Sequence, residues 1–134
     1  MATINTKYLG ELRSESVHLK SGKELMTDAP VDNNGKGETF SPTDLVCAAL
    51  TSCMMTIMGI KAKKEGYSIV GLTAQTTKIM NDSPRKIKAI QIEFEWPNPS
   101  VSGEKLERLK NAALTCPVAL SLSESLEQQI TFKF

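Results

Sequence analysis

The 134-residue sequence has one histidine, one tryptophan and three cysteines, and aromatic residues make up only 5% of it. Zinc sites need several ligands at short paired spacings, and no Cys-x-x-Cys pair is present, so we expect no metal. The single histidine, His18, lies in an alternating segment and is interpreted as a surface residue rather than a base or a ligand. No Gly-x-Gly-x-x-Gly or P-loop pattern follows a predicted strand, so we expect no cofactor.

An excess of charge of either sign is also missing. Lys and Arg number 16 against 15 acidic residues, a formal net charge of +1, which predicts no nucleic-acid partner. The first residues, MATINTKYLGEL, lack the charged and apolar regions of a secretory signal, and we expect a cytoplasmic location. Cysteines in that reducing compartment are expected to be thiols rather than a disulfide framework.

Length and composition favour one globular domain over residues 1–134, with 40% hydrophobic residues to form its core. Short extended segments are predicted over residues 2–9, 12–20 and 23–29, with a hairpin turn at Ser21-Gly22. The Gly- and Asn-rich stretch over residues 30–38 has no apolar periodicity and is predicted to be a surface loop.

A long helix follows. Ser41 is the predicted N-cap, Pro42 suits the first helical position, and Asp44 completes a capping box. Lysines at 61, 63 and 64 and then Gly66 predict the helix end. The 16 residues LVCAALTSCMMTIMGI are apolar or small on every face, which predicts burial all round, within a fold or at a subunit interface. They fall short of the roughly 18 to 20 residues of a membrane span, so we expect no membrane.

Later segments complete an α+β pattern. Strands are predicted over residues 67–80 and 86–96, joined by a turn at residues 81–84. Ser102 is expected to cap a helix that Pro117 ends, and a second helix is predicted from 117 to about 127. Residues 129–134 are predicted to form a final strand.

The three cysteines are not equivalent. Cys47 and Cys53 are separated by about 120° around the helix axis. Cys53 shares its face with apolar residues (Val46, Ala49, Leu50, Ile57 and Ile60). Cys116 precedes a proline at a helix junction, where the next helix dipole is expected to lower its thiol pKa. A buried cysteine usually serves as a small hydrophobic residue. We interpret Cys47 in this way, and for Cys53 and Cys116 both a packing role and a reactive role remain open.

The segment SPTDLVCAALTSC, residues 41–53, followed 63 positions later by Cys116-Pro117-Val118, resembles the OsmC/Ohr family, and the resemblance covers nearly the whole chain. It implies an OsmC-like α+β fold, with antiparallel sheets around a long central helix, in an intertwined homodimer whose active sites lie at the subunit interface.

The resemblance also implies chemistry. Cys53 would attack a hydroperoxide, Cys116 would close a disulfide with it, and an external dithiol would reset the enzyme. Arg13 matches the cation that stabilises the thiolate, with Arg85 as the alternative. Similar peroxidases carry Glu directly after the helix-start proline, where this chain has Thr43 followed by Asp44. Asp44 lies about 13 Å along the axis from Cys53, so it could assist only across a dimer, and its capping role explains it without catalysis.

The leading hypothesis is therefore a dithiol-dependent peroxidase in oxidative stress defence, with organic hydroperoxides preferred because the residues around Cys53 are apolar. One alternative is a dimeric binding module that holds a hydrophobic ligand against helix methionines (Met54, Met55 and Met58). The other is a thiol redox sensor without turnover.

Overall fold

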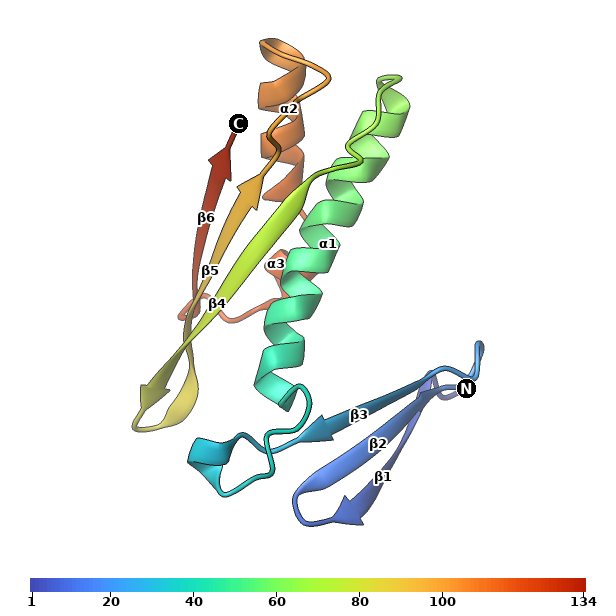
Figure 1. The fold of residues 1–134 in the computed structure, drawn as a ribbon, viewed down its shortest axis with the longest axis vertical. Coiled ribbons are helices and arrows are strands. Elements are labelled where there is room, and N and C mark those ends of the chain that lie inside the picture. The colour runs from blue at the N-terminus through green and yellow to red at the C-terminus, as the bar shows by residue number, and fades with distance from the viewer. The chain divides into compact units, whose positions relative to one another are not determined.

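The structure of the protein, a computed structural model, describes all 134 residues and has the predicted mixed α+β architecture (Figure 1). The chain divides into two compact units, residues 1–46 and residues 47–134, and each is described by itself. Each unit contains one three-stranded sheet, and the long helix α1 (Pro42–Lys64) begins in the first unit and continues into the second.

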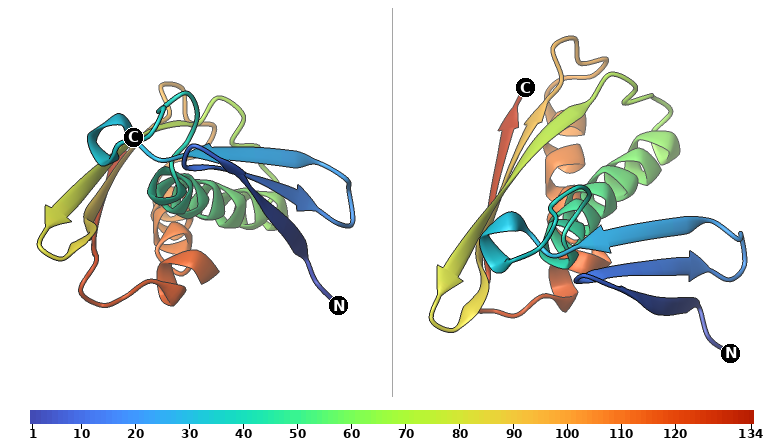
Figure 2. Two further views of the ribbon diagram at one scale, coloured as in Figure 1. Left: turned by 90° about the horizontal axis from the view of Figure 1, so that it is seen from below. Right: turned by 60° about the horizontal axis from the view of Figure 1, so that its bottom comes forward.

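The first unit is an antiparallel meander of β1 (Ile4–Gly10), β2 (Arg13–His18) and β3 (Glu24–Asp28), which confirms the three predicted segments (Figure 2). The predicted turn at Ser21-Gly22 joins β2 to β3, and Gly22 adopts a φ of 75°, which favours glycine there. The predicted loop contains one short 3-10 turn, Val31–Asn33. This meander places Arg13 and Asp28 opposite each other on neighbouring strands.

Helix α1 begins and ends as the sequence predicts. The Ser41 Oγ accepts a hydrogen bond from the Asp44 N–H at 3.1 Å, and the Asp44 carboxylate accepts one from the Ser41 N–H at 2.9 Å. At the other end, Gly66 has a φ of 81°, and the Tyr67 N–H donates to the Ala62 carbonyl at 3.0 Å. These contacts are a capping box and a Schellman motif, which satisfy backbone groups that every helix end leaves without partners.

Burial along α1 differs from the prediction. One stripe of the helix is buried: Cys47, Leu50, Met54, Met58 and Ala62. A second stripe, formed by Ala49, Ser52, Thr56 and Ile60, is exposed, and Ile60 is 47% exposed. The prediction of burial on every face is therefore not met within one chain. At 23 residues α1 is long and apolar enough to cross a membrane by length and composition alone, but its buried stripe contacts other elements of the second unit, as in a core helix.

The second unit is built on β4 (Thr73–Asp82), β5 (Arg85–Glu95) and β6 (Glu127–Lys133), in that order across the sheet. β4 and β5 are antiparallel, whereas β6 runs parallel to β5, which differs from the expected antiparallel pattern. β5 alternates as predicted, because Ile90, Ile92 and Phe94 are buried while Gln91 between them is exposed. The strand predicted from residue 67 starts only at Thr73, since Tyr67 completes the helix cap and Gly71 has a φ of 99°.

Two short helices complete this unit. α2 (Glu104–Ala113) has Gly103 at its N-cap, not the predicted Ser102, and no side chain caps it. α3 (Pro117–Ser121) ends well before residue 127, because Leu122 has an extended backbone. Side chains of α1, β5 and α2 form one core together with Cys116. This core positions the two cysteines described next.

Candidate functional site

Cys116 lies at the junction of α2 and α3. Its backbone is extended, as the following proline favours, and it is the N-cap residue of α3. The thiol sulfur accepts a hydrogen bond from the Ala119 N–H at 3.2 Å. The side chain is completely buried, so water cannot solvate a thiolate at this position.

Burial raises the pKa of the Cys116 thiol above its ordinary value. The Ala119 N–H acts in the opposite direction, and a hydrogen bond with the Cys53 thiol adds to the increase. The prediction that the helix dipole would lower this pKa is therefore wrong, because desolvation of the thiolate outweighs the favourable backbone contact. Cys116 remains a protonated thiol at neutral pH.

Cys53 lies on α1 and is only partly buried, at the edge of the hydrophobic core. Its thiol contacts that of Cys116, although the two residues are 63 positions apart. No disulfide joins the cysteines in this structure. Cys47 is 4% exposed and packs in the core. The structure thus brings together the two cysteines that the sequence paired and places Cys47 in the packed interior.

A second arrangement lies in the first unit. The Arg13 Nε donates to Asp28 Oδ1 at 2.6 Å, and its Nη2 donates to Oδ2 at 2.8 Å. The Arg13 guanidinium lowers the pKa of Asp28, and the carboxylate raises that of Arg13. Asp28 is fully buried, whereas the Arg13 side chain is 23% exposed. A buried carboxylate therefore fixes a charged, partly accessible guanidinium.

The loop before α1 packs beside this pair. The Glu38 N–H donates to Asp28 Oδ2 at 3.1 Å, and the Glu38 carboxylate lies 3.4 Å from Arg13 Nη2. Lys36 pairs with Glu11 at 2.6 Å. Gly35 permits this path, because a Cβ there would lie 1.8 Å from the Ala29 carbonyl oxygen. The loop thus contributes a second carboxylate and a backbone donor to the Arg13 environment.

The remaining predicted residues lie elsewhere. Thr43 Oγ1 is 3.2 Å from Ser41 Oγ, and Asp44 belongs to the capping box, which explains both at the helix start. Arg85 begins β5 opposite Asp82 and is exposed. His18 Nδ1 is 2.6 Å from Ser21 Oγ in an exposed turn, in agreement with a surface position.

Asp28 was not identified as a functional candidate in the sequence. Its place follows from the register of the β2–β3 hairpin, in which Asp28 lies opposite Arg13. Opposite charges placed directly across two strands stabilise each other.

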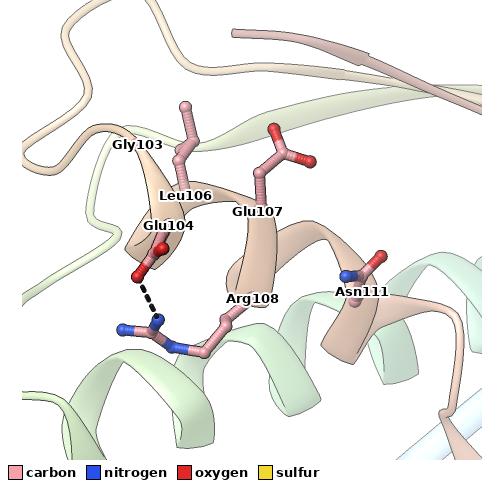
Figure 3. Close-up of a pocket in the computed structure, with 6 residues that line it drawn as sticks. All are labelled: Gly103, Glu104, Leu106, Glu107, Arg108 and Asn111. Atoms are coloured by element: carbon pink, nitrogen blue, oxygen red, sulfur yellow. Dashed lines mark ion pairs between the residues drawn. The ribbon is translucent and has the colours of Figure 1, made fainter.

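No group of three metal-binding side chains occurs in the described chain. A surface depression of about 570 Å³ lies along α2, where Arg108 approaches Glu104 at 4.0 Å (Figure 3). It contains no cysteine and none of the predicted site residues.

A family model described as OsmC-like protein matches residues 35–131. A search of curated proteins found no match. Among solved structures, the chain is similar to one from Psychrobacter arcticus 273-4, described as a candidate osmotic stress induced and detoxification response protein. The two sequences are 43% identical and the TM-score is 0.93, and the comparison covers 98% of this chain and 96% of that chain.

Two more distant structures have the same fold. An organic hydroperoxide resistance protein OsmC from Legionella pneumophila has 14% identity and a TM-score of 0.76, with 100% of this chain and 98% of that chain covered. The organic hydroperoxide resistance protein OhrB of Bacillus subtilis has 17% identity and a TM-score of 0.66, with 99% and 98% covered.

Proposed function

The chain belongs to the OsmC-like protein family, and from this premise we propose that it is a thiol-dependent peroxidase that reduces organic hydroperoxides in oxidative stress defence. One observation carries the proposal: the Cys53 thiol contacts the Cys116 thiol, and the first is partly accessible while the second is buried. A packing role alone does not require two cysteines from separate elements to meet.

Cys53 is the proposed nucleophile because its side chain is the more accessible of the two. Its thiolate attacks one peroxide oxygen, the O–O bond breaks, and the alkoxide leaves and takes a proton to form an alcohol. The sulfur becomes a sulfenic acid, which further peroxide can oxidise irreversibly unless a thiol condenses with it. Apolar side chains pack around this part of the core, including Met55 and Ile57, and favour an organic peroxide.

Cys116 is the proposed resolving thiol. Its sulfur attacks the Cys53 sulfenic acid, water leaves with the thiol proton, and a disulfide between the two residues forms. The raised pKa of Cys116 suits this order, because a thiol that stays protonated does not compete for the peroxide. An external dithiol then reduces the disulfide through a mixed disulfide and is itself oxidised.

We assign stabilisation of the Cys53 thiolate to Arg13. Apolar surroundings disfavour a thiolate, so a cation is needed at the reacting sulfur. Arg13 carries a permanent charge that is oriented by Asp28 and partly accessible. Arg85 is the weaker candidate, since it lies at an exposed strand start. Thr43 and Asp44 contribute to the helix start in this account.

We further propose that the chain works as a homodimer in the cytoplasm. The exposed stripe on α1 is small or apolar and could pack against a second helix. The first unit also exposes large side chains, among them Ile4, Tyr8 and Leu25. Exposed apolar surface of this kind is typical of protein contacts, and a second copy would cover it.

The test is consumption of an organic hydroperoxide in the presence of dithiothreitol. Wild type is expected to turn over, Cys53→Ser to lose activity, and Cys116→Ser to inactivate within a few turnovers as Cys53 is over-oxidised. Cys47→Ser is the matched control and is expected to retain activity. Unchanged turnover in Cys53→Ser contradicts the proposal. Stoichiometric oxidation without turnover instead favours a redox sensor.

A further inference from the structure

We propose that Gln128 is the residue that positions the resolving thiol, because its side chain holds the short helix α3 and, through it, the Cys116 sulfur beside Cys53. This inference rests on the proposed function, in which Cys116 closes a disulfide with Cys53. Gln128 acts through the backbone of Ala119, so it is a positioning residue and not a catalytic one.

Gln128 is a polar residue in an apolar row of β6. Residues that lie opposite each other on β5 and β6 point to the same face of the sheet, and side chains on that face alternate along each strand. Gln128 lies opposite the fully buried Ile90 and is itself partly buried. The other residues of this row are all apolar: Ile130 and Phe132 on β6, opposite Ile92 and Phe94 on β5. A polar side chain that points toward the core needs a hydrogen-bond partner.

The partner of Gln128 is the backbone of α3. The Gln128 Nε2 donates a hydrogen bond to the Ala119 carbonyl at 3.0 Å. The N–H of the same alanine donates to the Cys116 sulfur at 3.2 Å. Ala119 therefore binds the Gln128 side chain at its carbonyl and the thiol at its N–H, and this one residue connects the two.

Helix α3 needs an anchor of this kind. It has five residues, none of which is buried, and Leu120 is 75% exposed. A single helical turn is unstable on its own, because fixing its backbone costs more than its few hydrogen bonds return. The chain after α3 leads across to the start of β6 (Figure 1). The bond from Gln128 thus attaches α3 to the sheet at the point where the chain returns to it.

A positioning role and a general contribution to stability predict different results when this bond is removed. If the bond only stabilises the whole fold, Cys47 and Cys116 should become reactive together, since both are buried. If the bond holds α3 locally, Cys116 should become reactive while Cys47, on α1, stays protected. Local opening of one element exposes only the residues that this element covers.

The experiment measures alkylation of each cysteine by iodoacetamide in the reduced full-length protein at about pH 8, followed by peptide mass spectrometry. Gln128→Met removes the donor and suits the apolar row. We expect Cys116 to react about five- to tenfold faster than in wild type, since losing one hydrogen bond favours local opening by about this factor. The rate for Cys47 should change by less than about twofold.

Gln129→Met is the matched control. Gln129 lies next to Gln128 on β6 and also forms a side-chain hydrogen bond, in which its Oε1 accepts from the Gln91 Nε2 at 2.7 Å. Its side chain points to the opposite face of the sheet, because successive residues of a strand alternate. This variant should therefore leave the rate for Cys116 unchanged.

A second measurement follows Cys53 in excess tert-butyl hydroperoxide. The Cys116 thiol and further peroxide compete for the Cys53 sulfenic acid: the thiol gives a disulfide and water, and the peroxide gives a sulfinic acid and an alcohol. In Gln128→Met the loss of the Cys53 thiol should keep its wild-type rate within about twofold, while the over-oxidised fraction should rise at least about threefold. A general loss of stability would not change this ratio of products.

An unchanged rate for Cys116 in Gln128→Met overturns the inference, and so does equal acceleration of Cys47 and Cys116 in a variant that circular dichroism shows to be folded. An unchanged over-oxidised fraction in an active enzyme overturns it as well. If Gln128→Met does not fold, Gln128→Asn, which keeps the amide but is too short to reach the Ala119 carbonyl, must accelerate Cys116 alone, and any other result overturns the inference. Alkylation needs no peroxide, so it decides the role of Gln128 even if the wild type cannot reduce hydroperoxides, which would refute the proposed function alone.

Discussion

The Cys116 sulfur accepts a hydrogen bond from the Ala119 N–H at 3.2 Å, yet burial raises the pKa of this thiol. The partly accessible Cys53 is therefore expected to be alkylated first. At about pH 8, we predict that iodoacetamide modifies Cys53 at least tenfold faster than Cys116, because alkylation needs an accessible thiolate. Time-resolved peptide mass spectrometry of the native protein measures both rates. Equal rates in the folded protein would contradict the assignment of nucleophile and resolving thiol.

The ion pair between Arg13 and Asp28 predicts a loss of stability in acid. The pair lowers the pKa of Asp28 in the folded state, while the unfolded chain has a value near 3.9. The stabilisation is thus present above about pH 4 and is lost as pH falls through the lower folded value, because the unfolded state then binds more protons. Asp28→Asn should be less stable than wild type near neutral pH. Its free energy of unfolding should also fall less than that of wild type on acidification.

Urea unfolding at about pH 6 and about pH 3 tests this prediction. Asp28→Asn should still lose some stability in acid, because Arg108 also lowers the pKa of Glu65 and that carboxylate is unchanged in the variant. An identical loss of stability in the variant and in wild type would show that the Arg13–Asp28 pair does not contribute.

The start of α1 predicts a second stability effect. Ser41→Ala removes the hydroxyl that accepts the Asp44 N–H and should reduce the free energy of unfolding by about 1 kcal/mol. Ser102→Ala is the matched control, since Gly103 is the N-cap of α2 and no side chain caps that helix, and it should change stability by less than about 0.5 kcal/mol. Equal effects in chemical denaturation would argue against the capping contacts described here.

The core of the second unit depends on Phe94. This side chain is fully buried on β5 and stacks on Phe132 with ring centroids 5.4 Å apart. Phe94→Ala should lower the free energy of unfolding by about 3 to 5 kcal/mol, because it removes apolar contacts and leaves a cavity. Val70→Ala, at a position that is 90% exposed, should stay within about 0.5 kcal/mol of wild type in the same denaturation experiment.

Much of the fold was predictable from local sequence signals. The caps of α1 follow from Ser41, Asp44 and Gly66, and the alternation of β5 follows from its apolar residues, since both depend on near neighbours in the chain. The parallel pairing of β6 with β5 was not predictable, because it depends on packing between segments far apart in sequence. The same holds for the exposed stripe of α1, which composition alone could not reveal.

The candidate site was predictable in part. The motif around Cys53 and the Cys116-Pro117 junction identified two cysteines that the structure brings into contact. The direction of the pKa change at Cys116 could not be inferred, because it depends on complete burial of its side chain. The ion pair between Asp28 and Arg13 depends on the register between β2 and β3, which the local sequence signals do not determine.

The most direct test of this account is disulfide mapping after reduced protein reacts with one equivalent of an organic hydroperoxide. We predict the loss of two thiols per chain and a single linked peptide that joins Cys53 to Cys116. Retention of all three thiols, or a linkage that involves Cys47, would contradict it.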